Sequence, residues 1–344
     1  MNTSPQPDTP FESFLETDAP DSSALPVSDS IDDFVQQIKE TADKLIKDGA
    51  TRGDAKLLAH AMKELRHCFR VFANYRGIRK ATVFGSARTP TDSAVYRAAV
   101  EFGQRMTEAG WMTITGAASG IMEAGNVGAG REMSFGLNIL LPFEQGANTI
   151  IDGDPKLMNM RYFFTRKLML IKESDAAVLF PGGFGTHDEG FETLTLIQTG
   201  KSHVFPVVMI DEPGGTYWKR WLDFVKDDLL KRGYISPADL SLFLVTDSVD
   251  AAAREVMQFY RNYHSMRYVR GELVLRLQQR LPDTTAQQIA RDFTDIMEPG
   301  TLEQCAALPQ EMNEPAIAHL PRLKFRFDRH SHGRLRELIN VVNA

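Results

Sequence analysis

The sequence is poor in cysteine and has no long apolar run, and both shortages limit what the protein can be. Cys68 and Cys305 are the only cysteines, and they lie far apart without the spacing of a zinc site. We therefore expect a reducing, cytoplasmic setting and no structural metal. No apolar stretch approaches the roughly 18 residues that cross a bilayer, and we recognise no signal peptide. Because the net charge is −6 and no basic block occurs, we expect neither a nucleic-acid partner nor a membrane partner.

Two patterns of well-known protein sites are also missing. The early strand turns lack Gly-x-Gly-x-x-Gly followed by a ribose-binding acid, which argues against a dinucleotide-dependent oxidoreductase. His319, His330 and His332 are too scattered to form a metal site, so we interpret them as surface residues. We expect neither a metal nor an organic cofactor.

Changes of pattern divide the 344-residue chain into four parts. The first is rich in Pro, Ser, Thr and Asp and cannot bury enough apolar surface to fold. The second contains two amphipathic helices that we expect to pack on a sheet rather than to serve a site. The third alternates strands and helices, and the fourth mixes them in a smaller unit joined to the main sheet. The predicted parts are a disordered tail at 1–29, N-terminal helices at 30–79, an α/β domain at 80–264 and an α+β appendage at 265–344.

The alternation of strands and helices predicts an α/β fold with a Rossmann-like, doubly wound parallel sheet. The predicted helices are Ile31–Lys47 after an N-cap at Ser30, Asp54–Tyr75, Ser93–Ala109, Ile121–Gly130, Lys156–Glu173, Glu189–Thr199, Gly215–Lys231, Val249–Tyr263, Thr285–Met297 and Gly333–Val342. The predicted strands are Ala81–Phe84, Trp111–Thr115, Phe135–Leu141, Asp175–Phe180, Val204–Ile210, Leu242–Thr246, Glu272–Leu277, Thr301–Leu308 and Leu323–Asp328. We interpret Trp218 and Trp221 as packing residues of the core or of a dimer.

The most informative stretch is the glycine turn Pro181–Gly185, which follows a buried strand and precedes a helix. Glycines let the backbone approach an anion closely, and the first unpaired amides of a helix favour negative charge. We expect Thr186 to cap the helix and Glu189 to lie in its first turn, on the ligand side. The turn therefore predicts a phosphate site with an adjacent acid. The alternative is that the acid only complements the helix dipole.

Two earlier strands end in turns that belong to the same edge of the sheet. Ligands of open α/β sheets bind outside the carboxyl ends of the strands, so the turn Gly85–Arg88 is placed to touch a ligand. The turn after the second strand, Gly116–Gly120, leads into a helix that directs Glu123 and Asn126 back toward the site. Solvated helix-start residues are the alternative reading of these two side chains.

The spacing Pro-Gly-Gly-x-Gly-Thr-x-x-Glu, with Arg166 and Lys167 upstream, resembles the signature of the Lonely Guy (LOG) family. The likeness extends from Ala81 to Tyr263, about half of the chain, through separate motifs in the family's order. LOG proteins, long mislabelled lysine decarboxylases, hydrolyse nucleoside 5′-monophosphates, and the resemblance implies that activity here, with AMP or cytokinin ribotides as substrates. It also implies a homodimer or larger homo-oligomer in which neighbouring subunits complete the site.

The resemblance and the chemistry of N-glycosidic cleavage together suggest roles for single residues. We expect Glu189 to stabilise the ribosyl cation and to orient or deprotonate the attacking water, with Arg166 keeping it ionised. The stretch Leu141–Gln145 resembles one that lines the site in the family. The residues predicted to bind substrate are Gly85, Ser86, Arg88, Gly116, Gly120, Glu123, Lys167, Gly182, Gly183, Gly185, Thr186 and Glu192.

One turn departs from the family pattern and keeps an alternative function open. Ala117 and Ala118 replace glycines, and Ser119 replaces a proline, in a stretch that resembles Gly-Gly-Gly-Pro-Gly-Ile-Met-Glu-Ala. Because a Cβ disfavours positive φ and blocks close backbone approach, the change would narrow substrate choice or weaken activity. A non-catalytic nucleotide-binding regulatory protein is therefore the alternative. A lysine decarboxylase would need pyridoxal phosphate on a lysine, and no sequence context indicates one.

Overall fold

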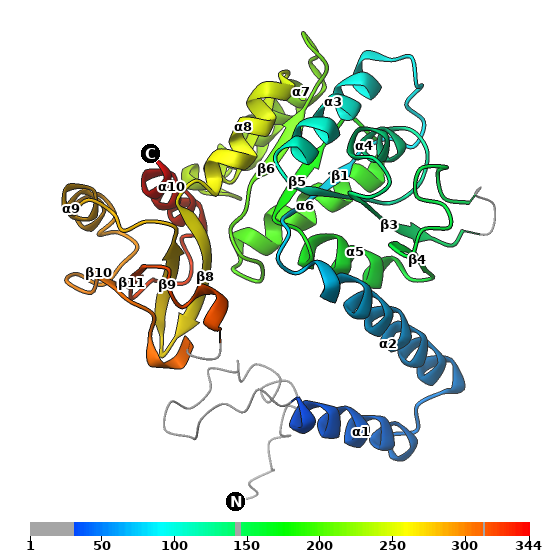
Figure 1. The fold of residues 1–344 in the computed structure, drawn as a ribbon, viewed down its shortest axis with the longest axis horizontal. Helices are drawn as coiled ribbons and strands as arrows, with labels where there is room; N and C mark the ends of the chain where they lie inside the picture. The colour runs from blue at the N-terminus through cyan, green and yellow to red at the C-terminus, as the bar shows by residue number, and fades with distance from the viewer. Residues whose placement is uncertain (1–30, 142–145, 312–313) are drawn as a thin grey trace, which may run out of the picture.

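The computed structural model describes residues 31–141, 146–311 and 314–344, which form two sheets with their helices (Figure 1). The predicted tail at 1–29 and the stretch Pro142–Gln145 lie outside the described residues. Seven strands make one sheet and four make another. The larger sheet is parallel and covered by helices, which confirms the predicted Rossmann-like α/β class. The proposed division into domains stays a prediction.

The parallel sheet consists of β1 (Lys80–Phe84), β2 (Met112–Thr115), β3 (Ser134–Ile139), β4 (Leu157–Met160), β5 (Ala176–Leu179), β6 (Val207–Ile210) and β7 (Phe243–Thr246). Its order is β4-β3-β2-β1-β5-β6-β7. The five inner strands are buried at every position, as expected for strands covered on both faces. In the register, Thr82 of β1 lies opposite Ile114 on one side and Ala177 on the other.

Helices cover both faces of this sheet and divide the core into two apolar layers. One face is covered by α3 (Ala94–Glu108), α4 (Ile121–Ala129) and α8 (Val249–Phe259). The other is covered by the end of α2 (Arg52–Phe72), followed by a short 3-10 turn η2 (Ala73–Tyr75), and by α5 (Phe163–Lys172), α6 (Phe184–Gln198) and α7 (Tyr217–Phe224). Ser93 starts α3 as predicted, because its hydroxyl accepts a hydrogen bond from the amide of Tyr96.

The chain reverses its direction across the sheet between β1 and β5. It runs outward from β1 to β4 on one side, and then returns to β5 and continues outward to β7. The turns that follow β1 and β5 therefore lie next to each other at the carboxyl edge. This reversal is where open α/β sheets form their ligand crevice.

The predicted helix Lys156–Glu173 is wrong in its first third. Residues Leu157–Met160 form β4, which pairs in parallel with β3, and α5 begins only at Phe163 after an extended residue, Tyr162. Leucine and methionine favour helices in isolation, and the pairing with β3 overrides that local preference. Arg161 consequently lies before α5 rather than on it.

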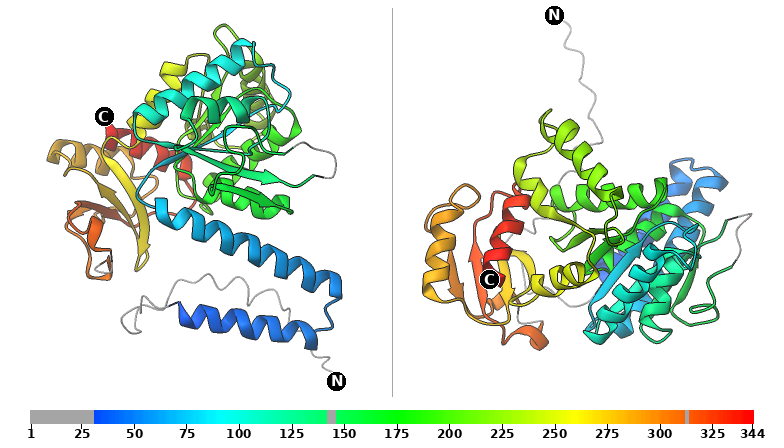
Figure 2. Two further views of the ribbon diagram at one scale, coloured as in Figure 1. Left: turned by 45° about the vertical axis from the view of Figure 1, so that its right-hand side comes forward. Right: turned by 90° about the horizontal axis from the view of Figure 1, so that it is seen from above.

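The two N-terminal helices differ in how they meet the sheet. The second half of α2 packs on it, with Cys68 and Phe72 buried and Phe72 stacked on Phe135 at 4.5 Å between ring centroids. In contrast, α1 (Asp32–Lys47), which follows the capping position Ile31, buries none of its residues and lies beyond α2 (Figure 2). The expectation that both helices pack on the sheet is therefore wrong for α1.

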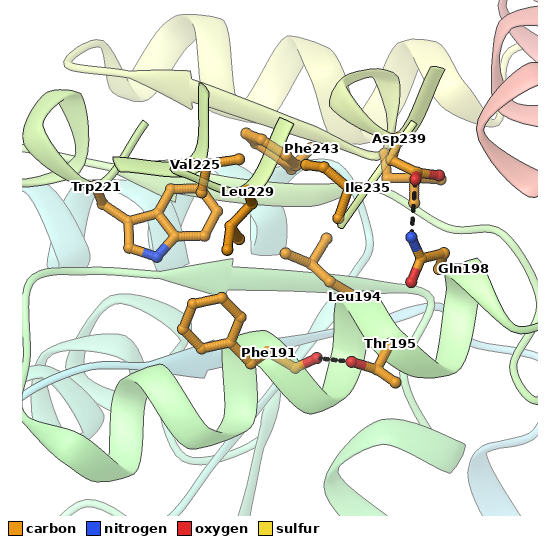
Figure 3. A pocket seen from close by; sticks show the side chains of 11 residues that line it. Phe191, Leu194, Thr195, Gln198, Trp221, Val225, Leu229, Ile235, Asp239 and Phe243 are labelled. Carbon is orange, nitrogen blue, oxygen red and sulfur yellow. Dashed lines mark hydrogen bonds between the residues drawn. The ribbon is translucent and has the colours of Figure 1, made fainter. Parts of the chain in front are cut away.

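Trp218 and Trp221 belong to the core, which agrees with the first of the two interpretations, packing in the core or in a dimer. The predicted helix Gly215–Lys231 splits into α7 and a π-helical segment, η3 (Val225–Leu230). Trp218 is buried in full, and Trp221 lies beside a small apolar cavity of about 90 Å³ between α6 and η3 (Figure 3). Phe191 and Leu194 of α6 form the opposite wall of that cavity.

The C-terminal strands form an antiparallel sheet of their own, which does not continue the main sheet. Its strands are β8 (Tyr263–Val269), β9 (Glu272–Leu277), β10 (Glu303–Cys305) and β11 (Arg322–Phe325), in the order β10-β11-β9-β8, with α9 (Asp283–Asp292) and α10 (His332–Asn343). The first of these strands was not predicted, because α8 ends at Phe259, earlier than its periodicity suggested.

The C-terminal part meets the main sheet's layers mainly through α10. His332 at the start of α10 donates from Nδ1 to the carbonyl of Gln198, the last residue of α6, at 3.1 Å. The side-chain amide of Gln198 donates to Asp239 of the 3-10 segment η4 (Pro237–Leu242) at 2.8 Å (Figure 3). Gly333 lies so close to η4 that a Cβ there would come within 2.3 Å of the Ala238 oxygen. The end of α6 is thus held from two sides, and His332 is a buried residue rather than the surface residue that the sequence suggested.

Candidate active site

Three turns meet at the carboxyl edge of the sheet. The Ser86 amide, after β1, donates to the Pro181 carbonyl, after β5, at 3.2 Å. The Ser86 carbonyl accepts from the amide of Ile121, at the start of α4, at 3.0 Å. The Ser119 hydroxyl donates to the Ala87 carbonyl at 2.9 Å. The turn after β1 therefore ties the other two together, as the sequence predicted from their shared edge.

Two glycines are required by the closeness of these turns. Gly120 has a φ of +65°, and a Cβ there would lie 2.3 Å from the Ser86 oxygen. A Cβ at Gly182 would lie 2.1 Å from the Thr186 hydroxyl and 3.0 Å from the Ser86 nitrogen. Any larger residue at either position would separate the turns.

Helix α6 begins earlier than predicted. Its capping residue is Gly183, whose carbonyl accepts from the amides of Thr186 and His187 at 3.1 and 3.3 Å. Thr186 is therefore the third residue of the helix and buried, not its N-cap, and Glu189 lies in the second turn rather than the first. Sequence reasoning placed the start too late because glycine is a poor helix former, and Gly185 nevertheless lies inside the helix.

The first amides of α6 are the polar groups available to an anion. Within the described residues, none accepts a hydrogen bond from the amides of Gly183, Phe184 or Gly185. A Cβ at Gly183 or Gly185 would meet nothing within 4 Å, so open space lies beside the backbone. Unpaired amides at the positive end of a helix dipole attract anionic groups such as phosphate.

Glu189 is a buried carboxyl group next to this helix start. Its side chain is only 6% exposed, and its Oε2 has no hydrogen-bond partner in the part of the chain that the structure describes. Burial raises the pKa of Glu189 to about 7, although the positive charges of Lys167 and Arg166 oppose the rise. A carboxyl group with such a pKa changes its protonation state near neutral pH, as a general acid or base requires.

Arg166 and Lys167 bring positive charge to Glu189 from α5. Arg166 also reaches the second turn, since a Cβ on Gly116 would lie 3.6 Å from its Nη1. The Lys167 amino group binds Asp188 at 2.7 Å and Glu192 at 2.5 Å. Burial opposes the charged form of Lys167, but these two hydrogen bonds outweigh it and raise the pKa of Lys167.

Three further predicted residues lie around these groups. Glu123 is half-buried in the first turn of α4 and lies near Tyr96 of α3, whose pKa is raised first by burial and then by the Glu123 charge. Arg88 is exposed, and its backbone amide donates to the Ser86 hydroxyl at 3.0 Å. Glu192 pairs with Lys167 and therefore neutralises that cation.

Ala117 adopts the conformation that its glycine counterpart would favour. Its φ is +61° and it is fully buried, so the alanine is strained without a change in the path of the backbone. Its amide donates to the Thr115 hydroxyl at 3.0 Å, and its carbonyl accepts from the Asn148 backbone amide at 2.8 Å and side-chain amide at 3.1 Å. Asn148 also donates to Asn126 at 3.0 Å. These contacts hold the turn in place.

Sequence reasoning missed three residues that support the site. Sequence reasoning assigns no role to Asn148, which holds the turn at Ala117, or to Asp188, which binds Lys167. Glu64 of α2 accepts from the Arg161 amide at 2.9 Å and from the Thr165 hydroxyl at 2.7 Å, which fixes the start of α5. Asp188 could have been found from its place one residue before the candidate acid, but no local signal marks Glu64.

Within the described ranges, 31–141, 146–311 and 314–344, no group of three or more His, Cys, Asp or Glu side chains is arranged to hold a metal ion. None of the helices in the same ranges combines the length and apolar character needed to span a bilayer.

Comparison with known proteins assigns the chain that carries this site to a family. A family model described as "Possible lysine decarboxylase" matches residues 114–256. A cytokinin riboside 5′-monophosphate phosphoribohydrolase of Mycobacterium tuberculosis is 30% identical over 172 residues, 49% of this chain and 88% of that protein. A rice protein (Oryza sativa subsp. japonica) named as a probable cytokinin riboside 5′-monophosphate phosphoribohydrolase is 32% identical over 165 residues, 46% of this chain and 63% of its own.

Among solved structures, the molybdenum cofactor binding protein from Rippkaea orientalis is similar over 51% of this chain and 93% of its own, with 18% identity and a TM-score of 0.36. The family assignment depends on the sequence relatives, because this chain covers most of the mycobacterial protein at 30% identity. The match with the family model spans the second and third turns together with Arg166 and Glu189. The chain therefore belongs to the LOG family, whose model still bears the older description of a lysine decarboxylase.

Proposed function

We propose that the protein hydrolyses the N-glycosidic bond of nucleoside 5′-monophosphates, releasing the free base and ribose 5-phosphate. The observation that carries this proposal is the buried carboxyl group of Glu189, with a pKa of about 7, beside a helix start whose amides are open to an anion. The names of the mycobacterial and rice relatives support the same reaction class.

The 5′-phosphate would bind at the start of α6. Gly182, Gly183 and Gly185 let the backbone come close, and Thr186 lies against Gly182. The helix dipole and the unpaired amides favour the dianion. Because the phosphate is remote from the bond that breaks, its binding energy positions the ribose for reaction.

Glu189 would act on the water and on the ribose. As the bond from C1′ to the base nitrogen breaks, its electron pair leaves with the base and positive charge develops on the ribose. The Glu189 carboxylate stabilises that charge and takes a proton from the water whose oxygen bonds to C1′. These roles require the ionised form, which the charges of Arg166 and Lys167 favour.

The remaining predicted contacts form the walls of the same crevice in this proposal. Arg166 lies between Gly116 and Glu189, where its charge serves both the ligand and the acid. Lys167 is bound by the carboxylates of Asp188 and Glu192. In this proposal it therefore contributes positive electrostatic potential to the site, not a free hydrogen-bond donor. The other residues proposed to contact the nucleotide are Gly85, Ser86, Arg88, Gly120, Glu123 and Glu192.

AMP is the default substrate in this proposal, and cytokinin riboside 5′-monophosphates are included because the relatives' names specify them. The test is a product assay by chromatography with AMP, GMP, CMP, UMP and IMP. We expect the wild-type protein to release the base. The Glu189→Gln variant should lose this activity, and the exposed control Glu101→Gln should keep it. Binding of AMP without any product would favour the alternative, a non-catalytic nucleotide-binding regulatory protein, which the strained alanine turn motivates.

We also propose that the protein works as a homo-oligomer in the cytoplasm. Family resemblance supports the first proposal, and the paucity of cysteine supports the second. Light scattering at working concentration tests the assembly, since a monomeric mass would contradict it.

A further inference from the structure

The turn between β5 and α6 contains carbonyl oxygens as well as amides, and carbonyl oxygens repel an anion. Two of them are occupied within the backbone. The Pro181 carbonyl accepts from the Ser86 amide at 3.2 Å, and the Gly183 carbonyl accepts from the amides of Thr186 and His187. Both oxygens therefore point away from the open space beside the helix start.

The third carbonyl, that of Gly182, is held by a side chain from another element. The Tyr217 hydroxyl, at the first position of α7, donates to it at 2.5 Å. Since the peptide bond is trans, the carbonyl of Gly182 and the amide of Gly183 point in opposite directions. Fixing the carbonyl toward α7 therefore fixes the Gly183 amide away from α7.

Tyr217 is itself held by His187 of α6. The His187 Nε2 lies 2.6 Å from the Tyr217 oxygen. The single phenolic proton is committed to Gly182, because a carbonyl can only accept, so His187 donates from Nε2. The imidazole ring packs at 5.5 Å from Trp218 and 6.3 Å from Phe191, between ring centroids. Burial raises the pKa of Tyr217 and lowers that of His187, so the phenol keeps its proton near neutral pH.

We propose that Tyr217, supported by His187, is a positioning residue that orients the Gly182–Gly183 peptide for binding of the substrate's 5′-phosphate. This inference rests on the function proposed above. Without the hydroxyl, the peptide is free to rotate and to present the Gly182 oxygen to the dianion in place of the Gly183 amide. Tyr217 does not touch the substrate; it acts through the backbone.

The experiment compares Tyr217→Phe, His187→Phe and the double variant with the wild-type protein. Tyr234→Phe is the matched control, because Tyr234 is 70% exposed and undergoes the same chemical change. Calorimetry measures the affinity for ribose 5-phosphate, and a product assay gives KM and kcat with AMP. We expect Tyr217→Phe to weaken ribose 5-phosphate binding and to raise KM by about tenfold, the effect of one lost hydrogen bond, while kcat changes little.

The comparison of the single variants with the double variant distinguishes a positioning role from a simple loss of packing. We expect His187→Phe to weaken binding less than Tyr217→Phe, and the double variant to be no weaker than Tyr217→Phe alone, because both act through one oxygen. Affinity for ribose 5-phosphate in Tyr217→Phe within twofold of the wild type would overturn the inference, as would an equal effect of Tyr234→Phe. If the wild type binds ribose 5-phosphate but releases no base, the proposed function fails while this test still decides the role of Tyr217.

Discussion

Replacing Glu189 by glutamine is predicted to lower activity and raise stability together. In the folded protein burial raises the pKa of Glu189 from its ordinary 4.5 to about 7. The folded state therefore binds a proton more tightly than the unfolded chain does. The stabilisation of the fold by this bound proton is fully present below pH 4.5 and is lost as the pH rises through about 7. At 1.36 kcal/mol for each pKa unit, the ionised carboxylate costs the fold roughly 3 kcal/mol above pH 7.

Glutamine has the same shape and no charge, so Glu189→Gln removes this cost. The buried amide then needs partners, and an unsatisfied one costs about 1–3 kcal/mol, so the net gain above pH 7 is about 0–2 kcal/mol. Urea denaturation of both proteins at pH 5 and pH 8.5 measures it. The wild type should lose stability relative to the variant between these two values.

The same substitution should slow release of adenine from AMP by about 10²–10⁴. For the wild type, kcat/KM should rise as the pH passes through about 7, because the reaction needs the carboxylate. An identical dependence of stability on pH in the two proteins would show that Glu189 is not a destabilised carboxylate. Near wild-type release of base by a folded Glu189→Gln variant would refute its catalytic role.

Three further substitutions test other parts of the site. Arg166→Gln should move the midpoint of the pH profile upward, because Arg166 lowers the pKa of Glu189, and should slow turnover at pH 7 by about 10²-fold. Ala117→Gly should stabilise the protein against urea by about 1 kcal/mol, because it relieves the strain of a φ of +61°. The control Ala118→Gly changes a position without positive φ and should destabilise the protein by about 0.5–1 kcal/mol. Gly183→Ala should leave the urea midpoint unchanged, since a Cβ there meets only open space, and should raise KM by filling that space; an unchanged KM would place the phosphate elsewhere.

The parts of the site that could be predicted from sequence are those with local causes. Glycines after a buried strand mark a turn whatever surrounds it, and Gly120 and Gly182 lie where close approach leaves no room for a Cβ. Turns that follow parallel strands lie at the same edge of a sheet, so the meeting of the turns after β1 and β5 was also accessible, although the reversal between these strands was not.

The parts that could not be predicted depend on contacts between distant segments. Pairing with β3 makes a strand of Leu157–Met160, although its residues favour a helix. Glu64 fixes the start of α5 from about a hundred positions away. The start of α6 at Phe184 depends on the Gly183 carbonyl, whose partners only the folded turn reveals.

The connection between α6 and the C-terminal part bears on how the protein can be shortened. One end of this helix presents Glu189 to the crevice, while the other is anchored by His332 and Asp239 through Gln198. A truncation that leaves out α10 would remove the buried apolar side chains of Leu335, Leu338 and Ile339, uncover the core residues packed around them, and release one of the two anchors. Fragments that contain only the region shared with LOG relatives should therefore be compared with the 344-residue chain, because the C-terminal part supports α6, the helix that bears Glu189.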